Sequence, residues 1–232
     1  VEPLADLYKD QVRSLGRHID LPRDLAERQP FPGPGLLVRC IGTVTKAKLH
    51  ALKLATEIVE QKIGPLRFDQ YFAAVIDNRF VNDPSAKSVR EVAANALGLP
   101  ASEVHSEVFE DRVTGVKGDE RCYGRLVGIK LQDDSRETYG WLPEKLRNLQ
   151  SGIVEKFTDV TRVVLLVKER RGSSSSSVLI RAVSTRDFMT TAVSPVSWKT
   201  LKDIADEVLK TGEASRVYYD ITPKPPATIE FE

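Results

Sequence analysis

Residues 179–221 contain, in order, the run LIRAVS (179–184), the segment WKTLKDIADEVL (198–209) and the run RVYYDI (216–221). The two runs are short, apolar and rich in β-branched or aromatic residues, which is typical of buried strands. The segment between them repeats apolar residues at i, i+3 and i+4, which predicts a helix with one buried face. Together the three elements predict a β-α-β unit.

An earlier part of the chain repeats this pattern. It predicts strands at 126–131 and 162–167 and a helix at 142–156. The segment TRVV at 161–164 also lies about 54 positions before SRVY at 215–218, which indicates a weak internal repeat. The sequence therefore predicts an α+β fold in which pseudo-duplicated β-α-β units form a mixed or antiparallel sheet with helices on one face.

Changes in composition along the chain suggest its internal boundaries. We expect two related halves at 113–172 and 178–232, joined by the serine run 173–177, which predicts a mobile turn because small polar residues bury little surface. A turn signal and a helix ended by Gly98 indicate that 77–110 is an insertion. The other predicted elements are a helix at 2–20, a loop at 28–36, a strand at 36–41, a helix at 45–61 and a strand at 70–76.

The overall composition is that of an ordinary globular domain. Of the 232 residues, 41% are hydrophobic and 29% are charged, with a formal net charge of +1. This charge argues against binding to nucleic acid or a membrane surface, and no apolar run approaches the roughly 20 residues that cross a bilayer. Cys40 and Cys122 form no C-x-x-C pair, so we expect a reduced, cytoplasmic protein, with a disulfide between them as the alternative. The only methionine is Met189, so we expect the native polypeptide to begin upstream of Val1.

The C-terminal residues 222–232, TPKPPATIEFE, do not have the composition of a disordered tail. The Pro225-Pro226 pair restricts the backbone and removes two amide donors, and a second strand-like run follows it. We therefore expect this segment to dock against the domain and to hold Lys224 and Glu230 in set directions. A lysine and a carboxylate on a rigid segment suit a phosphorylated ligand that also donates hydrogen bonds.

The segment GVKGDERCYG (115–124) combines three glycines with four charged side chains. Glycines let backbone amides approach a ligand, the Arg121 guanidinium matches a phosphate, and Asp119 accepts hydrogen bonds from hydroxyl or ring N–H groups. A charged hairpin turn without a ligand explains the same pattern, and both interpretations stay open. Cys122 lacks the glycine two positions earlier that a nucleophile turn requires, so we expect no catalytic residue here.

Arg181 lies inside the apolar run at 179–184, where an arginine needs either an internal carboxylate or an anionic ligand such as a phosphate. Both alternatives stay open at this point. The three histidines lie on separate predicted elements without ligand spacing, so we expect no metal site. The chain also lacks G-x-x-x-x-G-K-[ST], G-x-G-x-x-G and S-G-G-x-D-S phosphate loops, so we expect no ATP site of the usual kind.

Four motifs, in order along the chain, resemble the C-terminal part of GMP synthetase, the glutamine-hydrolysing enzyme that aminates XMP. They are RQPFPGPGL (28–36), GVKGDERCY (115–123), STRDFMT (184–190) and the run from YDI through KPPATIE (219–230). Residues 1–22 are similar to the end of that family's ATP-pyrophosphatase domain. The resemblance implies that residues 1–27 end that domain and that residues 28–232 form the C-terminal dimerisation domain. The chain has Gln29 where the family commonly has histidine, and Phe231 in place of the usual tryptophan.

The resemblance also implies an activity and a site. The whole enzyme of this family uses ATP and ammonia from glutamine to convert XMP to GMP. It implies a homodimer, a glutaminase domain or subunit as partner, and ATP and Mg²⁺ bound mainly by the upstream domain, so the fragment alone is expected to be inactive. It implies that Asp119, Lys224 and Glu230 bind XMP, and that Arg121 reaches the nucleotide directly or across the dimer interface. We add Arg181 to this candidate XMP site.

Two other classes of function compete with this interpretation. In the first, the chain is a non-catalytic homodimerisation module whose charged loops only form interface salt bridges. In the second it contacts RNA, which the near-neutral charge and the few aromatic residues disfavour.

Overall fold

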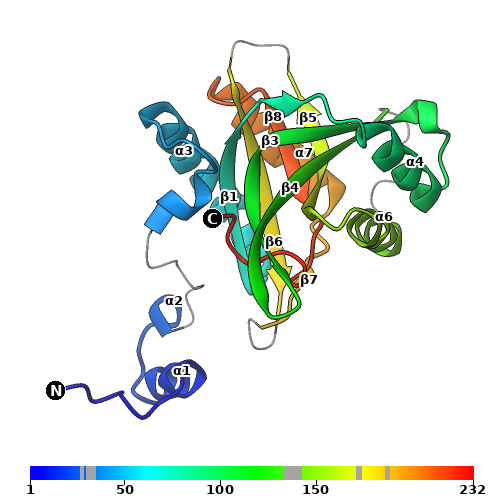
Figure 1. Cartoon of the computed structure of the whole chain (residues 1–232). Coiled ribbons are helices and arrows are strands. Elements are labelled where there is room, and N and C mark those ends of the chain that lie inside the picture. The colour runs from blue at the N-terminus through cyan, green and yellow to red at the C-terminus, as the bar shows by residue number, and fades with distance from the viewer. Residues whose placement is uncertain (27–28, 30–34, 133–142, 171–173, 186–188) are drawn as a thin grey trace. The chain divides into compact units, whose positions relative to one another are not determined.

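The computed structural model describes residues 1–26, 29, 35–132, 143–170, 174–185 and 189–232. The chain divides into two compact units, Val1–Phe31 and Pro32–Glu232, and each is described by itself (Figure 1). Most of the loop predicted at 28–36 and part of the STRDFMT motif lie outside the described residues.

The first unit contains two short helices, α1 (Lys9–His18) and α2 (Arg23–Ala26). The single helix predicted at 2–20 therefore begins later than expected. The backbone amide of Tyr8 donates a hydrogen bond to the Gln11 side chain over 2.8 Å, and this contact caps the start of α1.

The second unit is built on an eight-stranded sheet with the order β1-β6-β8-β5-β4-β3-β2, and β7 pairs with β6 outside this path. The strands are β1 (Gln70–Asp77), β2 (Phe80–Val81), β3 (Val104–Lys117), β4 (Glu120–Leu131), β5 (Val160–Glu169), β6 (Ser176–Ser184), β7 (Ala192–Val193) and β8 (Arg216–Asp220). The helices are α3 (Lys46–Ile63), α4 (Ala86–Leu97), α6 (Pro143–Lys156) and α7 (Trp198–Lys210), with 3₁₀ turns η1 (Gly35–Arg39), η2 (Gly64–Leu66) and η3 (Ala101–Glu103).

The predicted duplication of β-α-β units is confirmed. Strands β4 and β5 are parallel and joined through α6, and β6 and β8 are parallel and joined through α7. The inner strands of the two units, β5 and β8, pair antiparallel at the centre of the sheet. Each unit is extended outward by one antiparallel strand, β3 beside β4 and β1 beside β6. The sheet is therefore mixed, as expected for the α+β class.

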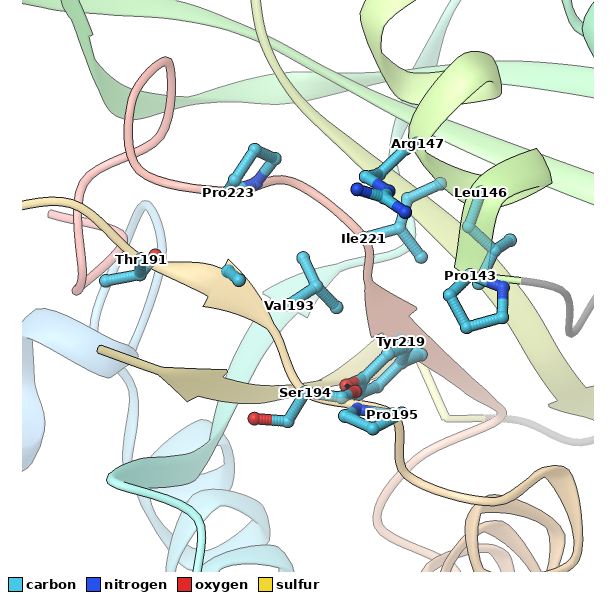
Figure 2. Close-up of a pocket in the computed structure, with 11 residues that line it drawn as sticks. Pro143, Leu146, Arg147, Thr191, Val193, Ser194, Pro195, Tyr219, Ile221 and Pro223 are labelled. Atoms are coloured by element: carbon cyan, nitrogen blue, oxygen red, sulfur yellow. Dashed lines mark hydrogen bonds between the residues drawn. The ribbon is translucent and has the colours of Figure 1, made fainter. Parts of the chain in front are cut away.

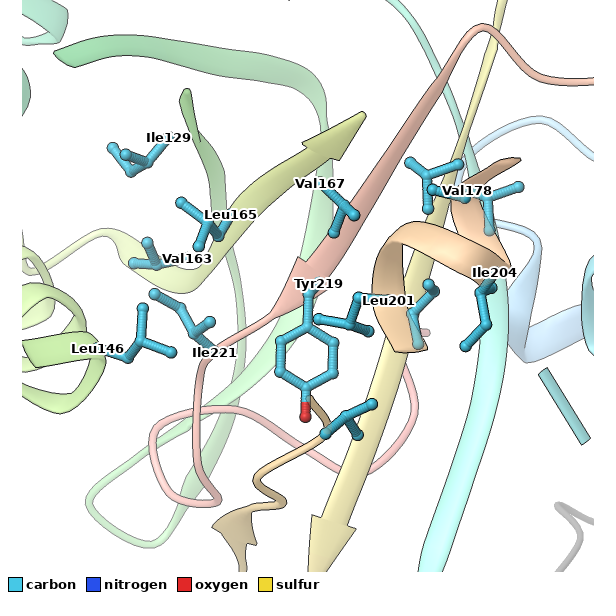
Figure 3. Packing of buried hydrophobic residues seen from close by; sticks show 14 of the residues in the cluster. Ile129, Leu146, Val163, Leu165, Val167, Val178, Leu201, Ile204, Tyr219 and Ile221 are labelled. Atoms are coloured by element: carbon cyan, nitrogen blue, oxygen red, sulfur yellow. The ribbon is translucent and has the colours of Figure 1, made fainter. Parts of the chain in front are cut away.

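One face of the sheet is covered by helices α3, α4, α6 and α7. Their apolar side chains and the strands beneath them form the larger hydrophobic cluster, part of which is drawn in Figure 3. There, Leu201 and Ile204 of α7 face Val178 of β6 and Tyr219 of β8, and all four side chains are fully buried. Helix α7 forms here because its apolar residues recur at helical spacing, and because the Ser197 side chain caps its start by accepting from the Thr200 amide.

The opposite face has a second, smaller cluster and is covered by irregular chain. Its centre includes Phe72, Leu166 and Tyr218 from the strands, Ile41 from the segment after η1, and Phe231 from the C-terminal end. The strand predicted at 36–41 is wrong, because residues 35–39 form the 3₁₀ turn η1 and only Cys40 makes a bridge, to Val75 of β1. Six residues, five of them apolar, are too few to distinguish a strand from a tight turn by periodicity alone.

The predicted insertion and the serine run have different outcomes. In 77–110, the helix that Gly98 was expected to end is α4, and Gly98 closes it in the left-handed conformation (φ 69°). The last residues of this stretch belong to β3. The serine run was expected to be a mobile turn, which is wrong for Ser176 and Ser177, because they begin β6 and are buried, with the Ser177 hydroxyl bonded to Asn78. Ser173 lies outside the described residues.

Candidate functional site

The last twelve residues, 221–232, are called the C-terminal segment below. This segment is docked against the sheet, as its composition predicted. Lys224 exchanges backbone hydrogen bonds with Thr191 next to β7. The segment then runs antiparallel to the last residues of β3, beside the turn of the β3–β4 hairpin, where Gly115 pairs with Ala227. Near its end, the Thr114 amide donates to the Phe231 carbonyl over 2.9 Å. Figure 1 shows the segment in red beside the green hairpin.

The charged run 115–124 forms the turn of the β3–β4 hairpin. Gly118 takes the left-handed conformation that the turn requires (φ 59°), and Asp119 and Arg121 are exposed beside it. The run therefore has the hairpin turn that one of the two interpretations predicted. It does not exclude a ligand, because the two charged side chains remain accessible.

Gly115 and Gly124 have a role that the sequence did not indicate. A Cβ atom on Gly115 would lie 2.5 Å from Thr161 Cγ2 and 2.9 Å from the Pro226 carbonyl oxygen. A Cβ on Gly124 would also collide with Thr161 and with the Asp159 carbonyl. The glycines therefore let β5 and the C-terminal segment approach the hairpin closely.

We expect Gly115→Ala to lower the free energy of unfolding by about 1–3 kcal/mol, the usual cost of overpacking a close contact. The comparison is Gly152→Ala in α6, where the new methyl group would meet only Val92 Cγ1 at 3.3 Å and the change favours helix. Urea unfolding of both variants checks this. Equal stabilities for the two would contradict the role given to Gly115.

Beneath the C-terminal segment lies a buried ion cluster formed by Arg162, Arg181 and Asp220. All three side chains are fully buried. The Asp220 Oδ2 atom accepts from Arg162 Nη1 over 2.7 Å and from Arg181 Nη1 over 2.6 Å. Of the two alternatives for Arg181, the structure contains the internal salt bridge, and its guanidinium does not reach the surface.

The two guanidinium groups also hold the backbone of the C-terminal segment. Arg181 donates to the carbonyls of Thr222 (2.9 Å) and Thr228 (3.0 Å), and Arg162 donates to the carbonyls of Thr228 (2.8 Å) and Glu230. Burial and the nearby positive charge of Arg181 lower the pKa of Arg162 to about 9, while Asp220 opposes this shift. The Arg162 group therefore stays charged at neutral pH and binds these carbonyls as a cation.

The two charged side chains predicted on the C-terminal segment have different surroundings. Lys224 is half-buried, and its backbone amide also contacts the Thr191 hydroxyl over 3.0 Å. The Glu230 side chain is 16% exposed and accepts two hydrogen bonds from Arg39, from Nε over 3.0 Å and from Nη2 over 3.1 Å. The structure thus brings Lys224 and Glu230 onto one docked segment, whose middle pairs with the hairpin that carries Asp119 and Arg121.

Two residues of this region were missed by sequence reasoning. Arg162 interrupts an apolar strand in the same way as Arg181, so the signal was present in the TRVV segment. Arg39 also interrupts a short apolar run, at 36–41, but that run was predicted as a strand and its 3₁₀ conformation was not.

Comparison with known proteins agrees with this geometry. Residues 167–231 match the family model described as the GMP synthase C terminal domain. Over its whole length, the chain is 42% identical to a subunit of the glutamine-hydrolyzing GMP synthase of Sulfurisphaera tokodaii and 39% identical to the corresponding protein of Saccharolobus solfataricus, and it covers 56% of each. The identity to the corresponding protein of Halobacterium salinarum is 32%, with 48% of that protein covered.

The chain belongs to the GMP synthetase family. It spans about half the length of the curated relatives it matches. The stretch that matches the GMP synthase C-terminal domain includes Arg181, Asp220 and the C-terminal segment to Phe231, but not Asp119, Arg121 or Arg39. The match to the family model thus covers the docked segment and two of the three residues of the buried cluster, Arg181 and Asp220.

This GMP synthetase part also has a pocket of about 360 Å³, and Pro223 of the C-terminal segment is one of the residues that line it (Figure 2). Its walls are mainly apolar and come from the start of α6, from residues 191–195 and from the end of β8. The Arg147 guanidinium lies at the rim in Figure 2, and Tyr219 lies at the opposite end, with its hydroxyl donating to the Ser194 carbonyl over 2.6 Å. Burial raises the pKa of Tyr219, so this hydroxyl stays protonated. None of the predicted XMP residues lines this pocket.

Other kinds of site are absent from the described ranges. No group of histidine, cysteine and carboxylate side chains there is arranged to hold a metal ion. No helix in those ranges combines the length and the hydropathy that crossing a bilayer demands. Cys40 and Cys122 are both free thiols, and burial raises the pKa of the Cys40 thiol.

Proposed function

We propose that this chain is the XMP-binding and dimerisation region of a cytoplasmic GMP synthetase, which converts XMP to GMP in purine nucleotide biosynthesis. The docked C-terminal segment is the observation that supports this most directly. A loose tail would have to be ordered by the ligand at an entropic cost, whereas this segment is already held by the buried arginines.

Each of the four accessible side chains has a chemical role in this proposal. The Lys224 ammonium and the Arg121 guanidinium bind the 5′-phosphate, Lys224 as a compact charge and Arg121 through paired N–H groups. The carboxylates of Asp119 and Glu230 accept hydrogen bonds from ribose hydroxyls or from xanthine N–H groups. Arg181 does not contact XMP in this scheme. It orients the backbone on either side of Lys224 through the carbonyls of Thr222 and Thr228.

We assign the binding of ATP and the supply of ammonia to other parts of the enzyme. ATP and Mg²⁺ are bound mainly by an upstream ATP-pyrophosphatase domain, and none of the residues of the C-terminal segment is assigned to them. The relatives are each named as one subunit of a glutamine-hydrolysing enzyme. This supports a separate glutaminase subunit, which supplies ammonia, rather than a fused glutaminase domain. Two copies associate through this region to form a homodimer.

Lys224→Ala in the full-length enzyme tests the proposal. With ammonia supplied directly, the KM for XMP should rise about 10- to 100-fold, the equivalent of one charge-assisted hydrogen bond of about 1.5–3 kcal/mol. The KM for ATP should change little. Lys199→Ala is the matched control, because Lys199 is an exposed lysine on α7, one of the helices that cover the other face of the sheet. Equal increases in the KM values for XMP and ATP would refute this assignment of Lys224.

A pure dimerisation module is the second candidate, and one observation favours it. Glu230 already forms an ion pair with Arg39, so its charge has a structural use without any ligand. The two candidates differ in a binding measurement. If the region binds XMP, millimolar XMP should raise the melting temperature of the full-length enzyme, and Lys224→Ala should remove that increase while the dimer persists.

A further inference from the structure

Arg39 forms a buried, two-bond ion pair with Glu230 of the C-terminal segment, which is more specific in geometry than a surface ion pair. Its side chain is only 2% exposed, and its Nε and Nη2 atoms donate one bond to each oxygen of Glu230. This paired arrangement fixes both the position and the rotation of the carboxylate, because a planar fork meets a planar acceptor.

Arg39 is itself held firmly against the sheet. Its guanidinium lies over the Phe72 ring of β1, 4.1 Å from the ring centre, and the Phe72 and Phe231 rings meet edge-on at 6.3 Å. The Arg162 guanidinium lies over the Phe231 ring, 4.0 Å from its centre. The side chains therefore form a continuous series of contacts in the order Arg39, Phe72, Phe231 and Arg162, which we call the stacked column.

A second contact ties the same two parts of the chain together. The Gly42 amide donates to the Glu232 side chain over 3.1 Å. Residues 39–42 are in turn anchored on β1, where the Ile41 amide donates to the Val75 carbonyl over 2.9 Å. The end of the C-terminal segment is thus fastened to β1 by way of residues 39–42, more than 180 positions earlier in the chain.

The ion pair leaves Glu230 able to bind a ligand. An ionised carboxylate offers about four acceptor positions, and the Arg39 fork occupies one on each oxygen. The Glu230 side chain keeps 16% of its surface exposed. We propose that Arg39 is a positioning residue, which holds the Glu230 carboxylate at the orientation in which its free acceptor positions meet the N–H or hydroxyl donors of a purine nucleotide. This inference rests on the proposed binding of XMP.

The experiment uses the full-length enzyme with ammonia as nitrogen donor. Arg39→Ala should raise the KM for XMP about 10-fold and leave the KM for ATP within about 2-fold, since only the XMP contact depends on Glu230. Arg39→Lys should restore only part of the loss, because one ammonium replaces a two-bond fork. In a Glu230→Gln background, Arg39→Ala should add little further loss, since two residues that act through one contact are not additive.

Arg125→Ala controls for the loss of a partly buried arginine. Like Arg39, Arg125 pairs with carboxylates, but its partners Asp83 and Asp159 lie outside the C-terminal segment. It should lower stability without a selective change in the KM for XMP. Where Arg39→Ala does not fold, Arg39→Lys carries the test through its KM values and the same Glu230→Gln background.

Two results would overturn the inference. One is an unchanged KM for XMP in a folded Arg39 variant, and the other is full additivity with Glu230→Gln. Lys224→Ala separates these from failure of the proposed function. If Lys224→Ala raises the KM for XMP and Arg39→Ala does not, XMP binding stands and the positioning role fails. If neither variant changes it, both are wrong.

Discussion

Asp220→Ala is expected to lower the free energy of unfolding by about 3–5 kcal/mol, the loss that follows when one partner of a buried ion pair is removed. Asp220 is the carboxylate that both Arg162 and Arg181 contact. Without it, two fully buried guanidinium groups would lose the one carboxylate that both of them contact. Since a domain has only about 5–15 kcal/mol of stability in total, this one change should bring the chain close to unfolding at growth temperature.

Urea unfolding at 25 °C checks this expectation, with Asp206→Ala as the matched control. Asp206 also pairs with a cation, Lys168 over 2.5 Å, but both side chains are almost half exposed. An exposed pair of this kind contributes at most about 1 kcal/mol. If the Asp220 variant cannot be purified, Asp220→Asn keeps the shape and removes the charge. Losses of the same size at positions 206 and 220 would mean that the buried cluster is not important for stability.

Phe231→Ala is the second change with a large expected effect, about 3–5 kcal/mol for a fully buried phenylalanine. The ring is 0% exposed and is the third member of the stacked column, between Phe72 and Arg162. Because Phe231 lies at the end of the C-terminal segment and in none of the strands, we expect much of this loss to appear as local release rather than as unfolding of the sheet.

Hydrogen exchange followed by mass spectrometry distinguishes local release from global unfolding. In Phe231→Ala, the amides of residues 227–232 and the Thr114 amide should exchange faster, while those in β5 and β8 should not. The KM for XMP should rise in the full-length enzyme. Phe157→Ala, one residue after α6 and packed against the larger hydrophobic cluster, should lower stability but leave the exchange of residues 227–232 unchanged. Slow exchange of the segment in Phe231→Ala would show that the column does not hold it.

The sequence was sufficient for the elements that bury long apolar stripes. The bounds of α7 and β8 lie within one residue of their predicted positions, because periodicity and flanking turn residues both point to the same boundaries, and β6 ends as predicted but begins three residues earlier. It was not sufficient for the segment around η1, where the conformation depends on contacts with β1 far along the chain. Ser176 and Ser177 were misjudged for the same reason, since pairing with β1 buries them regardless of their polarity.

The candidate site was predictable in part. The KPPATIE motif, with Lys224 and Glu230, marks a docked segment because its composition does not suit a tail. The partners of these residues were not predictable, because Arg39 and Glu230 are 191 positions apart and no local pattern relates them. The role of the hairpin glycines was also predicted only in part. Their number indicated that another group approaches the backbone closely, and a ligand was one interpretation. In the structure, the group that approaches Gly115 and Gly124 is the side chain of Thr161.

The order of the strands has a consequence for synthesis on the ribosome. Strand β1 pairs only with β6 among the long described strands, and the partner residues Gln70 and Val183 are separated by the entire β4-α6-β5 unit. A nascent chain therefore carries an unpaired apolar strand while more than a hundred further residues are made. Contacts of such long separation are slow to form, so the emerging chain needs protection from aggregation, and the C-terminal segment can dock only after both β-α-β units have been made.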